Sequence, residues 1–451
     1  MRQLVNRITC WYIVFYALYS ISTRFMPTAI FCQGTLADVL YKSVIIGAGI
    51  LALFYFLLLA KTRRRPDKSL ILLAAFVFLL GISTLLNREY EFTGNILGTA
   101  TFTAQLIVFY CLARMMPEQM LAGCMRRTAL FTSLFWTPGC AISLYQYIGN
   151  IHYTTLNADF RFIRQGIIDG RLFGLFSDPN FAAFTSLLII LLLVFTLRTW
   201  KHKIFVCYGA VCIFINMAYI IMSNSRTIYI TAVGTLLFFV LLATYRRHRQ
   251  EETMDKRLMK RDFVRNTLIA LASVAAVYAA IFFSMQGIGY VVAPDRDIDD
   301  MVREDVNLEN LSNNRTTIWK NYVTLYTDKP LFGFSVRSAL PYATSKYPDS
   351  YLAKTQYVTH NGYLSLLVET GLTGFLVMGA FFLLTFVQFI KRVRKKEALS
   401  DSYVLFTAIT AAVLMFLFCF HDVFFTVNIE TMLLFIAIGF INSGQTISKT
   451  S

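Results

Sequence analysis

Hydrophobic residues in this chain gather into long stretches separated by polar connections. A helix that crosses a bilayer needs about 20 consecutive apolar residues. About twelve such stretches occur, near residues 8–30, 43–60, 69–86, 94–115, 127–148, 180–199, 203–222, 226–245, 264–285, 360–390, 402–420 and 424–442. The pattern therefore predicts an all-α, polytopic membrane protein with about twelve transmembrane helices.

Composition supports the same class of protein. Hydrophobic residues make up 56% of the 451 residues, charged residues only 15%, and the mean hydropathy is +0.56. Soluble domains average roughly 45–50% apolar and about 25% charged residues. An ordinary water-soluble enzyme is therefore not expected.

The charges are divided unequally between the two sides of the predicted bundle. Each basic cluster joins an even-numbered span to the next odd one, so that side carries 27 Lys and Arg against 8 acidic residues, and the other side 15 against 18. The positive-inside rule then places both termini in the cytoplasm and the protein in the cytoplasmic membrane of the cell. The net charge of +16 is therefore interpreted as a signal for membrane orientation and for contact with lipid headgroups. No nucleic acid is expected, because no zinc-finger spacing or RNA-binding motif occurs.

The spans divide the chain into four predicted regions. These are residues 1–150 with transmembrane helices 1–5, 151–285 with helices 6–9, an extracytoplasmic loop at 286–359, and 360–451 with helices 10–12. Loops this long are uncommon unless they are functional or disordered. The first part of the loop, at 294–310, is acidic. Its Asp295–Asp300 cluster is the one place outside the membrane where carboxylates could bind a metal, but the usual meaning of such a cluster is a solvated, flexible acidic loop, and no cofactor is expected.

The second part of the loop predicts a short amphipathic helix. Trp319, Tyr322, Val323 and Tyr326 recur at helical spacing, and Pro330 follows them. We expect this helix to rest at the outer membrane interface with its aromatic side chains at headgroup depth.

Four polar motifs are predicted to face the outer compartment. They are RLFGLFSDPN (171–180), NSRT (224–227), NNRTTIW (313–319) and THNGY (359–363). Three precede helices that run inward, so each presents the partial positive charge of a helix N-terminus to the outer face. Asp178 before a proline, Asn224 or Ser225, and Thr359 are the expected caps.

Three arginines in these motifs are candidates for binding an anion such as a diphosphate. The planar guanidinium fork binds phosphate oxygens in pairs and keeps its charge. Arg171, Arg226 and Arg315 are these candidates, although an arginine at a membrane boundary can also simply reach the lipid headgroups. Asp178, Asn180, Ser225 and Asn361 are expected to support them.

His360 is the candidate general base. An imidazole beside arginines and helix N-termini would stay neutral and could accept a proton from a sugar hydroxyl. A single histidine at a helix end can equally be a cap or an interfacial residue.

The four motifs, in this order, resemble those of bacterial O-antigen ligases and the related O-antigen and capsule polymerases. The segment HNGYLSLLVETGLTG, with Gly371 and Gly374, is similar to the family's signature, and the stretch NNRTTIW…PLFGFS is similar to another of its blocks. The likeness covers roughly residues 160–390. Phe375 and Leu376 stand where the ligases often have two threonines, which leaves ligase and polymerase open.

The resemblance implies a membrane-embedded, inverting glycosyltransferase of the C-type architecture that needs no metal. Its donor would be an undecaprenyl-diphosphate-linked glycan and its acceptor a glycan or a lipid. Carried over by position, Arg171, Arg226 and Arg315 would hold the diphosphate and His360 would activate the acceptor hydroxyl. The alternative is a flippase or other transporter of lipid-linked glycans, but transporters concentrate ionisable groups near the bilayer midplane, whereas these motifs lie at one face.

Overall fold

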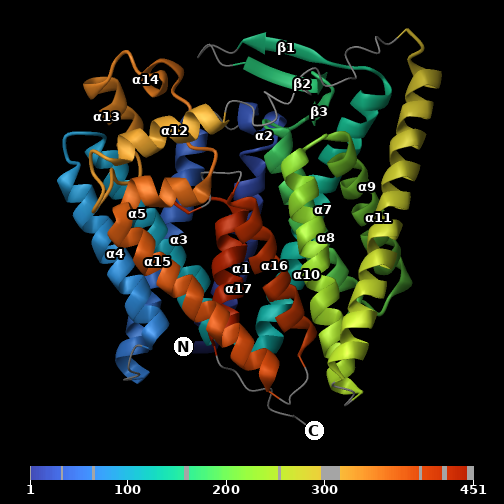
Figure 1. Cartoon of the computed structure of the whole chain (residues 1–451), viewed down its shortest axis with the longest axis horizontal. Coiled ribbons are helices and arrows are strands. Elements are labelled where there is room, and N and C mark those ends of the chain that lie inside the picture. The colour runs from blue at the N-terminus through green and yellow to red at the C-terminus, as the bar shows by residue number, and fades with distance from the viewer. Residues whose placement is uncertain are drawn as a thin grey trace.

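The computed structural model describes residues 2–31, 34–62, 67–156, 162–251, 255–295, 315–395, 399–418 and 424–443. Its long helices stand side by side, with a small sheet and several short helices at one end (Figure 1). We call this end the loop face, and the opposite end, where α1 begins and α17 ends, the termini face.

The helices are α1 (Arg2–Ser22), α2 (Met26–Phe31), α3 (Thr35–Thr62), α4 (Lys68–Leu86), α5 (Phe92–Gln105), the π-helix η1 (Leu106–Leu112), α6 (Ala113–Met115), α7 (Glu118–Ile148), α8 (Pro179–Leu197), α9 (Lys203–Met222), α10 (Arg226–Gln250), α11 (Lys256–Val292), α12 (Arg315–Tyr326), α13 (Ala339–Lys346), α14 (Tyr351–Thr355), α15 (Gly362–Arg394), α16 (Asp401–Phe416) and α17 (Ile429–Asn442). The strands are β1 (Tyr153–Leu156), β2 (Phe162–Ile168) and β3 (Arg171–Gly174).

The helices confirm the predicted class of protein. Among the described residues, nine helices are long and apolar enough to cross a membrane when α5, η1 and α6 are counted as one. The remaining predicted spans are helical as well: α7 has 31 residues, and α16 and α17 are shorter apolar helices. The chain is therefore an all-α, multi-pass membrane protein.

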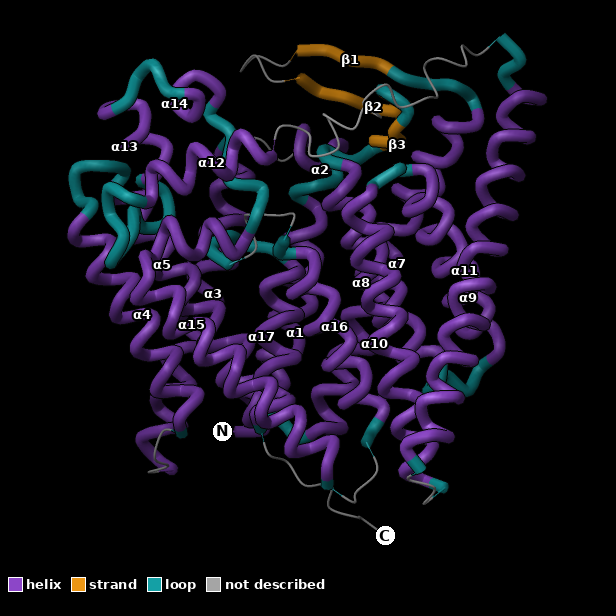
Figure 2. The backbone as a smooth tube through the Cα atoms, viewed as in Figure 1, coloured by secondary structure: helices purple, strands orange, loops and turns teal. Residues whose placement is uncertain are grey.

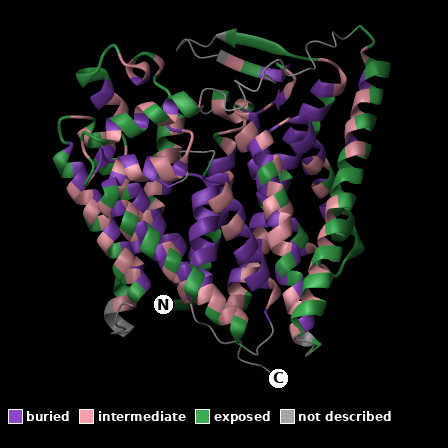
Figure 3. Ribbon diagram, viewed as in Figure 1, coloured by how far each residue is buried: buried purple, intermediate pink, exposed green. Residues whose placement is uncertain are grey.

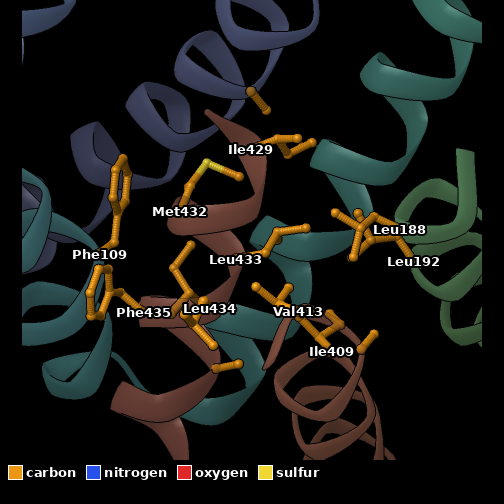
Figure 4. Close-up of a cluster of buried hydrophobic side chains, with 14 of the residues drawn as sticks. Phe109, Leu188, Leu192, Ile409, Val413, Ile429, Met432, Leu433, Leu434 and Phe435 are labelled. Atoms are coloured by element: carbon orange, nitrogen blue, oxygen red, sulfur yellow. The ribbon is translucent and has the colours of Figure 1, made fainter. Parts of the chain in front are cut away.

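The core of the bundle is built around α17. All 14 of its residues are buried, as expected for a helix that is apolar on every side. Figure 4 shows Phe435 facing Phe109 of η1, while Leu433 points toward Val413 of α16 and Leu188 of α8. The edge of the bundle is different, because α11 is exposed along most of its length (Figure 3).

The loop face carries a three-stranded antiparallel sheet that the hydropathy pattern did not predict (Figure 2). Strands β2 and β3 form a hairpin in which Ile168 pairs with Arg171. The two residues between them, Asp169 and Gly170, have φ of 52° and 64°, the left-handed conformation that a tight hairpin turn requires. Arg171 therefore begins a strand directly after this turn.

A break divides α15, which we expected to be one continuous span. Gly371 has φ 66° and ψ −176° inside the helix, a conformation open essentially only to glycine. Figure 1 shows the result as a short upper arm, residues 362–370, and a long arm that descends to the termini face. The upper arm therefore stays at the loop face.

The segment 330–335 (PLFGFS) fills the break in α15. The backbone N–H of Phe334 donates to the carbonyl of Val368 at 2.9 Å, and that of Leu372 to the carbonyl of Pro330 at 2.8 Å. These bonds satisfy helix-end groups that the break would otherwise leave without partners. Residues 330–335 and the chain around Gly371 are thus held together by backbone hydrogen bonds.

We expect Gly371→Ala to destabilise the protein strongly. A non-glycine residue in this backbone conformation costs about 1–3 kcal/mol, and a Cβ at this position would also lie 2.3 Å from the carbonyl oxygen of Leu331. Thermal unfolding in detergent measures the effect. Gly379→Ala is the matched control, because a Cβ there meets nothing within 4 Å and alanine favours the helix; equal melting temperatures for the two variants would contradict the prediction.

The predicted helix after the acidic segment is present as α12, but its inward face differs from the expected one. Ile318, Tyr322 and Leu325 are buried, whereas Val323 is 52% exposed. The helix packs on α14 and α15, so Tyr322 faces protein instead of lipid headgroups. Of the acidic segment 294–310, only Pro294 and Asp295 lie within the described residues.

Lys329 fastens the segment after α12 to the connection between α4 and α5. Its ammonium donates to Oδ1 of Asn87 at 2.6 Å and lies within 5.5 Å of the ring centres of Tyr90, Phe334 and Tyr342. Burial among these rings lowers the pKa of Lys329. The short helices of the loop face are therefore anchored to the bundle.

Candidate functional site

Asn180 joins two of the polar motifs. Its Oδ1 accepts hydrogen bonds from Nη2 of Arg171 and from Oγ of Ser225, each at 2.7 Å. Residues from β3, the start of α8 and the start of α10 thus meet at one amide oxygen. The predicted grouping of Arg171, Asn180 and Ser225 is present in the structure.

Local sequence explains why these helices begin here. Asp178 is the N-cap of α8 and accepts from the backbone N–H groups of Asn180 and Phe181 at 2.7 and 3.0 Å, with Pro179 in the first turn. Ser225 precedes α10, but its hydroxyl bonds Asn180 and makes no cap. Asn224 instead donates to the carbonyl of Gly170 at 3.3 Å, which ties its motif to the hairpin.

This arrangement places two helix N-termini and two guanidinium groups in one region. Arg226 is the first residue of α10 and follows Ser225 directly. Arg171 and Arg226 are both partly exposed. Helix N-termini and arginines each favour negative charge, so the region suits an anion with several oxygens.

His360 lies immediately before the upper arm of α15. It has a left-handed backbone with φ 47°, and its neighbour Asn361 is the N-cap, accepting from the N–H groups of Tyr363 and Leu364 at 3.0 and 3.1 Å. The expected cap, Thr359, was wrong. Asn361 takes that role because its side chain reaches the first turn while Thr359 is turned toward Ser365.

Helix α12 holds the segment that carries His360. Trp319 Nε1 donates to the carbonyl of Thr359 at 2.9 Å, and the hydroxyl of Tyr322 donates to the carbonyl of Tyr357 at 3.0 Å. The helix and the segment therefore run antiparallel. Arg315 lies one turn before Trp319 on the same face of α12.

The elements that carry the two groups of residues both contact the end of α16. Phe181 and Phe184 of α8 contact the ring of Phe416, with ring centres 6.1 and 3.7 Å apart. On the other side, the N–H of Gly362 donates to the carbonyl of Leu417 at 2.6 Å. Helix α8, which carries Asn180, and the start of α15, which follows His360, thus pack against the same helix end.

Sequence reasoning missed a buried ion pair beside this site. Both guanidinium Nη atoms of Arg24 bond the carboxylate of Glu430, at 2.5 and 2.8 Å, and the two side chains are 13% and 0% exposed. Arg24 also lies over the ring of Phe181, 4.4 Å from its centre. The N–H of Ser177 donates to the Arg24 carbonyl at 3.0 Å, so Arg24 supports the chain that leads into α8.

Metal-binding side chains do not gather in the part of the chain that the structure describes, where no three His, Cys, Asp or Glu residues lie together. Of the Asp295–Asp300 cluster only Asp295 is described, and it is exposed.

Comparison with known protein families gives a match that includes part of this site. Residues 210–379 match the family model of the O-antigen ligase. The chain therefore carries an O-antigen ligase domain over these residues. The family implies glycan transfer in a membrane with lipid-linked glycan substrates. None of the curated proteins compared with the chain matches it.

The O-antigen ligase domain contains Arg226, Arg315 and His360, whereas Arg171 and Asn180 precede it. The bond from Ser225 to Asn180 connects the two parts. The hairpin before α8 is therefore joined to the O-antigen ligase domain at the site itself.

Proposed function

We propose that the chain transfers a glycan from an undecaprenyl-diphosphate-linked donor to an acceptor hydroxyl at the outer face of the cytoplasmic membrane. Arg171, Arg226 and Arg315 bind the diphosphate, and His360 accepts the proton of the acceptor hydroxyl. The reaction is metal-independent and inverts the anomeric carbon.

One observation carries this proposal. Asn180 binds Arg171 and Ser225, which precedes Arg226 at the start of α10, and both α8 and the residue after Asn361 contact the end of α16. This arrangement supports a site in which the arginines bind the leaving diphosphate and His360 takes the proton. These are the two functions that glycan transfer from a diphosphate requires.

The acceptor oxygen attacks the anomeric carbon from the face opposite the diphosphate and forms the new glycosidic bond. The bond from the anomeric carbon to the diphosphate oxygen breaks, and its electron pair leaves with the diphosphate. The acceptor proton passes to the imidazole of His360, while the arginines stabilise the negative charge that grows on the leaving group.

The location follows from the charge distribution. The end of α10, the start of α11, the end of α15 and the start of α16 lie at the termini face (Figure 1). The sequence next to these helix ends belongs to the strongly basic side of the chain. The positive-inside rule then puts the termini face in the cytoplasm and the site outside. The acceptor is a growing glycan or a lipid-linked core, in keeping with polymerase or ligase activity.

We expect Arg171→Ala to lower kcat about 10²–10³-fold, the usual effect of removing one group that stabilises developing negative charge. Arg171→Lys should recover part of this loss, because lysine keeps the charge but not the paired fork. The assay uses purified protein with undecaprenyl-diphosphate-linked oligosaccharide and acceptor, and it measures new glycosidic bonds and released diphosphate lipid.

Arg164→Ala is the matched control for this series. Arg164 and Arg171 lie at similar distances from the ring of Phe173, 5.9 and 6.0 Å from its centre, but Arg164 is exposed on β2. It should keep nearly full activity. If wild-type protein in vesicles moved the donor across the membrane without forming any bond, the proposal would fail in favour of a transporter.

A further inference from the structure

A large cavity lies at the opposite end of the bundle from the candidate site. Its volume is about 970 Å³, at the upper end of the roughly 300–1,000 Å³ typical of ligand pockets. Side chains of α3, α4, α5 and η1 line it, and most of them are apolar. Two of these, Phe56 and Phe78, are 55% and 69% exposed, so the cavity opens on the apolar outside of the bundle.

The cavity extends over the depth of one membrane leaflet. Along α4 its lining runs from Leu70 to Phe78, and along α5, η1 and α6 from Thr103 to Met115. At 1.5 Å per residue these stretches are about 12–18 Å long. The hydrocarbon core of a bilayer is about 30 Å thick, so the cavity reaches from the termini face to the middle of the membrane.

The end of the cavity at the termini face is polar and cationic. Arg114 forms an ion pair with Asp67 and donates to Oγ of Ser69 at 3.1 Å. Arg2 reaches the same place and donates to the carbonyl of Met115 at 2.6 Å. Two guanidinium groups against one carboxylate leave a net positive charge where lipid headgroups lie.

The carboxylate in this cluster stays ionised. Burial alone would raise the pKa of Asp67, but hydrogen bonds from Arg114 and Ser69 outweigh it and lower the pKa to about 2. The charge balance at the cavity end therefore holds across the pH range in which membranes are studied.

An unusual helix forms the back wall. Residues Leu106, Ile107 and Cys111 of the π-helix η1 face the cavity, and π-helical turns are rare and occur frequently at functional sites. On its other side η1 packs closely on α17, since a Cβ at Gly439 would lie 2.7 Å from the carbonyl of Tyr110. The π-helix η1 thus lies directly against the cavity.

We propose that this cavity binds an anionic phospholipid from the leaflet at the termini face, with acyl chains between α3 and α4 and the phosphate near Arg2 and Arg114. An apolar trough one leaflet deep fits acyl chains, and its cationic end selects a negative headgroup. This site is separate from the proposed transfer reaction and does not depend on it.

Native mass spectrometry of the detergent-purified full chain tests the proposal, with phosphatidylglycerol and phosphatidylcholine added in parallel. We expect wild-type protein to retain phosphatidylglycerol preferentially. Ala74→Trp, which fills the cavity, should abolish this binding, whereas Ile71→Trp should not, because Ile71 is exposed on the same helix outside the lining.

Arg2→Gln should reduce the preference for phosphatidylglycerol about fivefold, the effect of one cation near an anionic headgroup. Arg7→Gln is its control, since Arg7 is exposed on the same helix but does not line the cavity. Equal retention of both lipids by the wild type, or unchanged binding by Ala74→Trp, would overturn the proposal. Preferential retention of undecaprenyl phosphate over phosphatidylglycerol would overturn it as well.

Discussion

His360→Ala lowers the rate of glycan transfer about 10²–10⁴-fold, the usual contribution of acid–base catalysis, and leaves donor binding largely unchanged. The reason is that His360 acts on the acceptor, whereas the arginines hold the donor. Turnover with saturating donor measures the first effect, and retention of the donor lipid by the purified variant measures the second.

The backbone at His360 calls for a second variant. With φ at 47°, alanine would be strained, so a loss of activity in His360→Ala alone could reflect altered structure. Asparagine tolerates the left-handed region and lacks a basic group. We therefore expect His360→Asn to be as inactive as His360→Ala while unfolding at the wild-type temperature.

His152→Ala is the matched control for a histidine at the loop face. His152 is exposed between α7 and β1, and nothing in the proposed reaction uses it. Its replacement should leave the rate within about twofold of wild type. Full activity in His360→Asn would remove His360 from the reaction.

Arg24→Ala destabilises the protein by about 3–5 kcal/mol, because it leaves the carboxylate of Glu430 buried without its counter-ion. Glu430 is fully buried and Arg24 is only 13% exposed, so solvent cannot replace the lost interaction. Denaturation in detergent, followed by the loss of folded protein, measures this change.

The double variant Arg24→Met with Glu430→Leu separates charge from packing. Replacing both partners of a buried pair by apolar groups is often neutral, so the double variant should recover most of the stability lost in Arg24→Ala. Lys42→Ala is the exposed control: Lys42 and Asp38 lie 3.7 Å apart and are 69% and 72% exposed, and such pairs contribute at most about 1 kcal/mol. Similar losses for Arg24→Ala and Lys42→Ala would contradict the account.

The sequence predicted the parts of the fold that depend on hydrophobic length. Each long apolar stretch contains a helix among the described residues, and α12 includes the aromatic residues at helical spacing and ends before Pro330. The N-cap at Asp178 followed from Asp-Pro. These features are local, so one segment of sequence suffices to specify them.

Features that depend on distant segments were not predicted. The break at Gly371 exists because residues 330–335 supply hydrogen bonds to it, and Arg24 is 406 residues from Glu430. The hairpin was predictable in principle, because Asp169-Gly170 is a strong hairpin signal. The hydropathy pattern did not show it, because β2 and β3 are only 7 and 4 residues long.

The candidate site was predicted by residue type and by side of the membrane. The hydrogen bonds between these residues were not predicted, because nothing in the sequence indicated that Asn180 would accept from both Arg171 and Ser225. Hydrogen bonds of this kind depend on how β3, α8 and α10 pack. The residue types of the site could therefore be inferred from the sequence, whereas the contacts between Arg171, Asn180 and Ser225 depend on the fold.

The most direct test of the central claim is a structure of the protein in a lipid nanodisc with undecaprenyl diphosphate bound. The account predicts the diphosphate within hydrogen-bond distance of Arg171 and Arg226, with the imidazole of His360 facing the same space. Diphosphate density away from both arginines, or a His360 ring turned toward a different cavity, would contradict it.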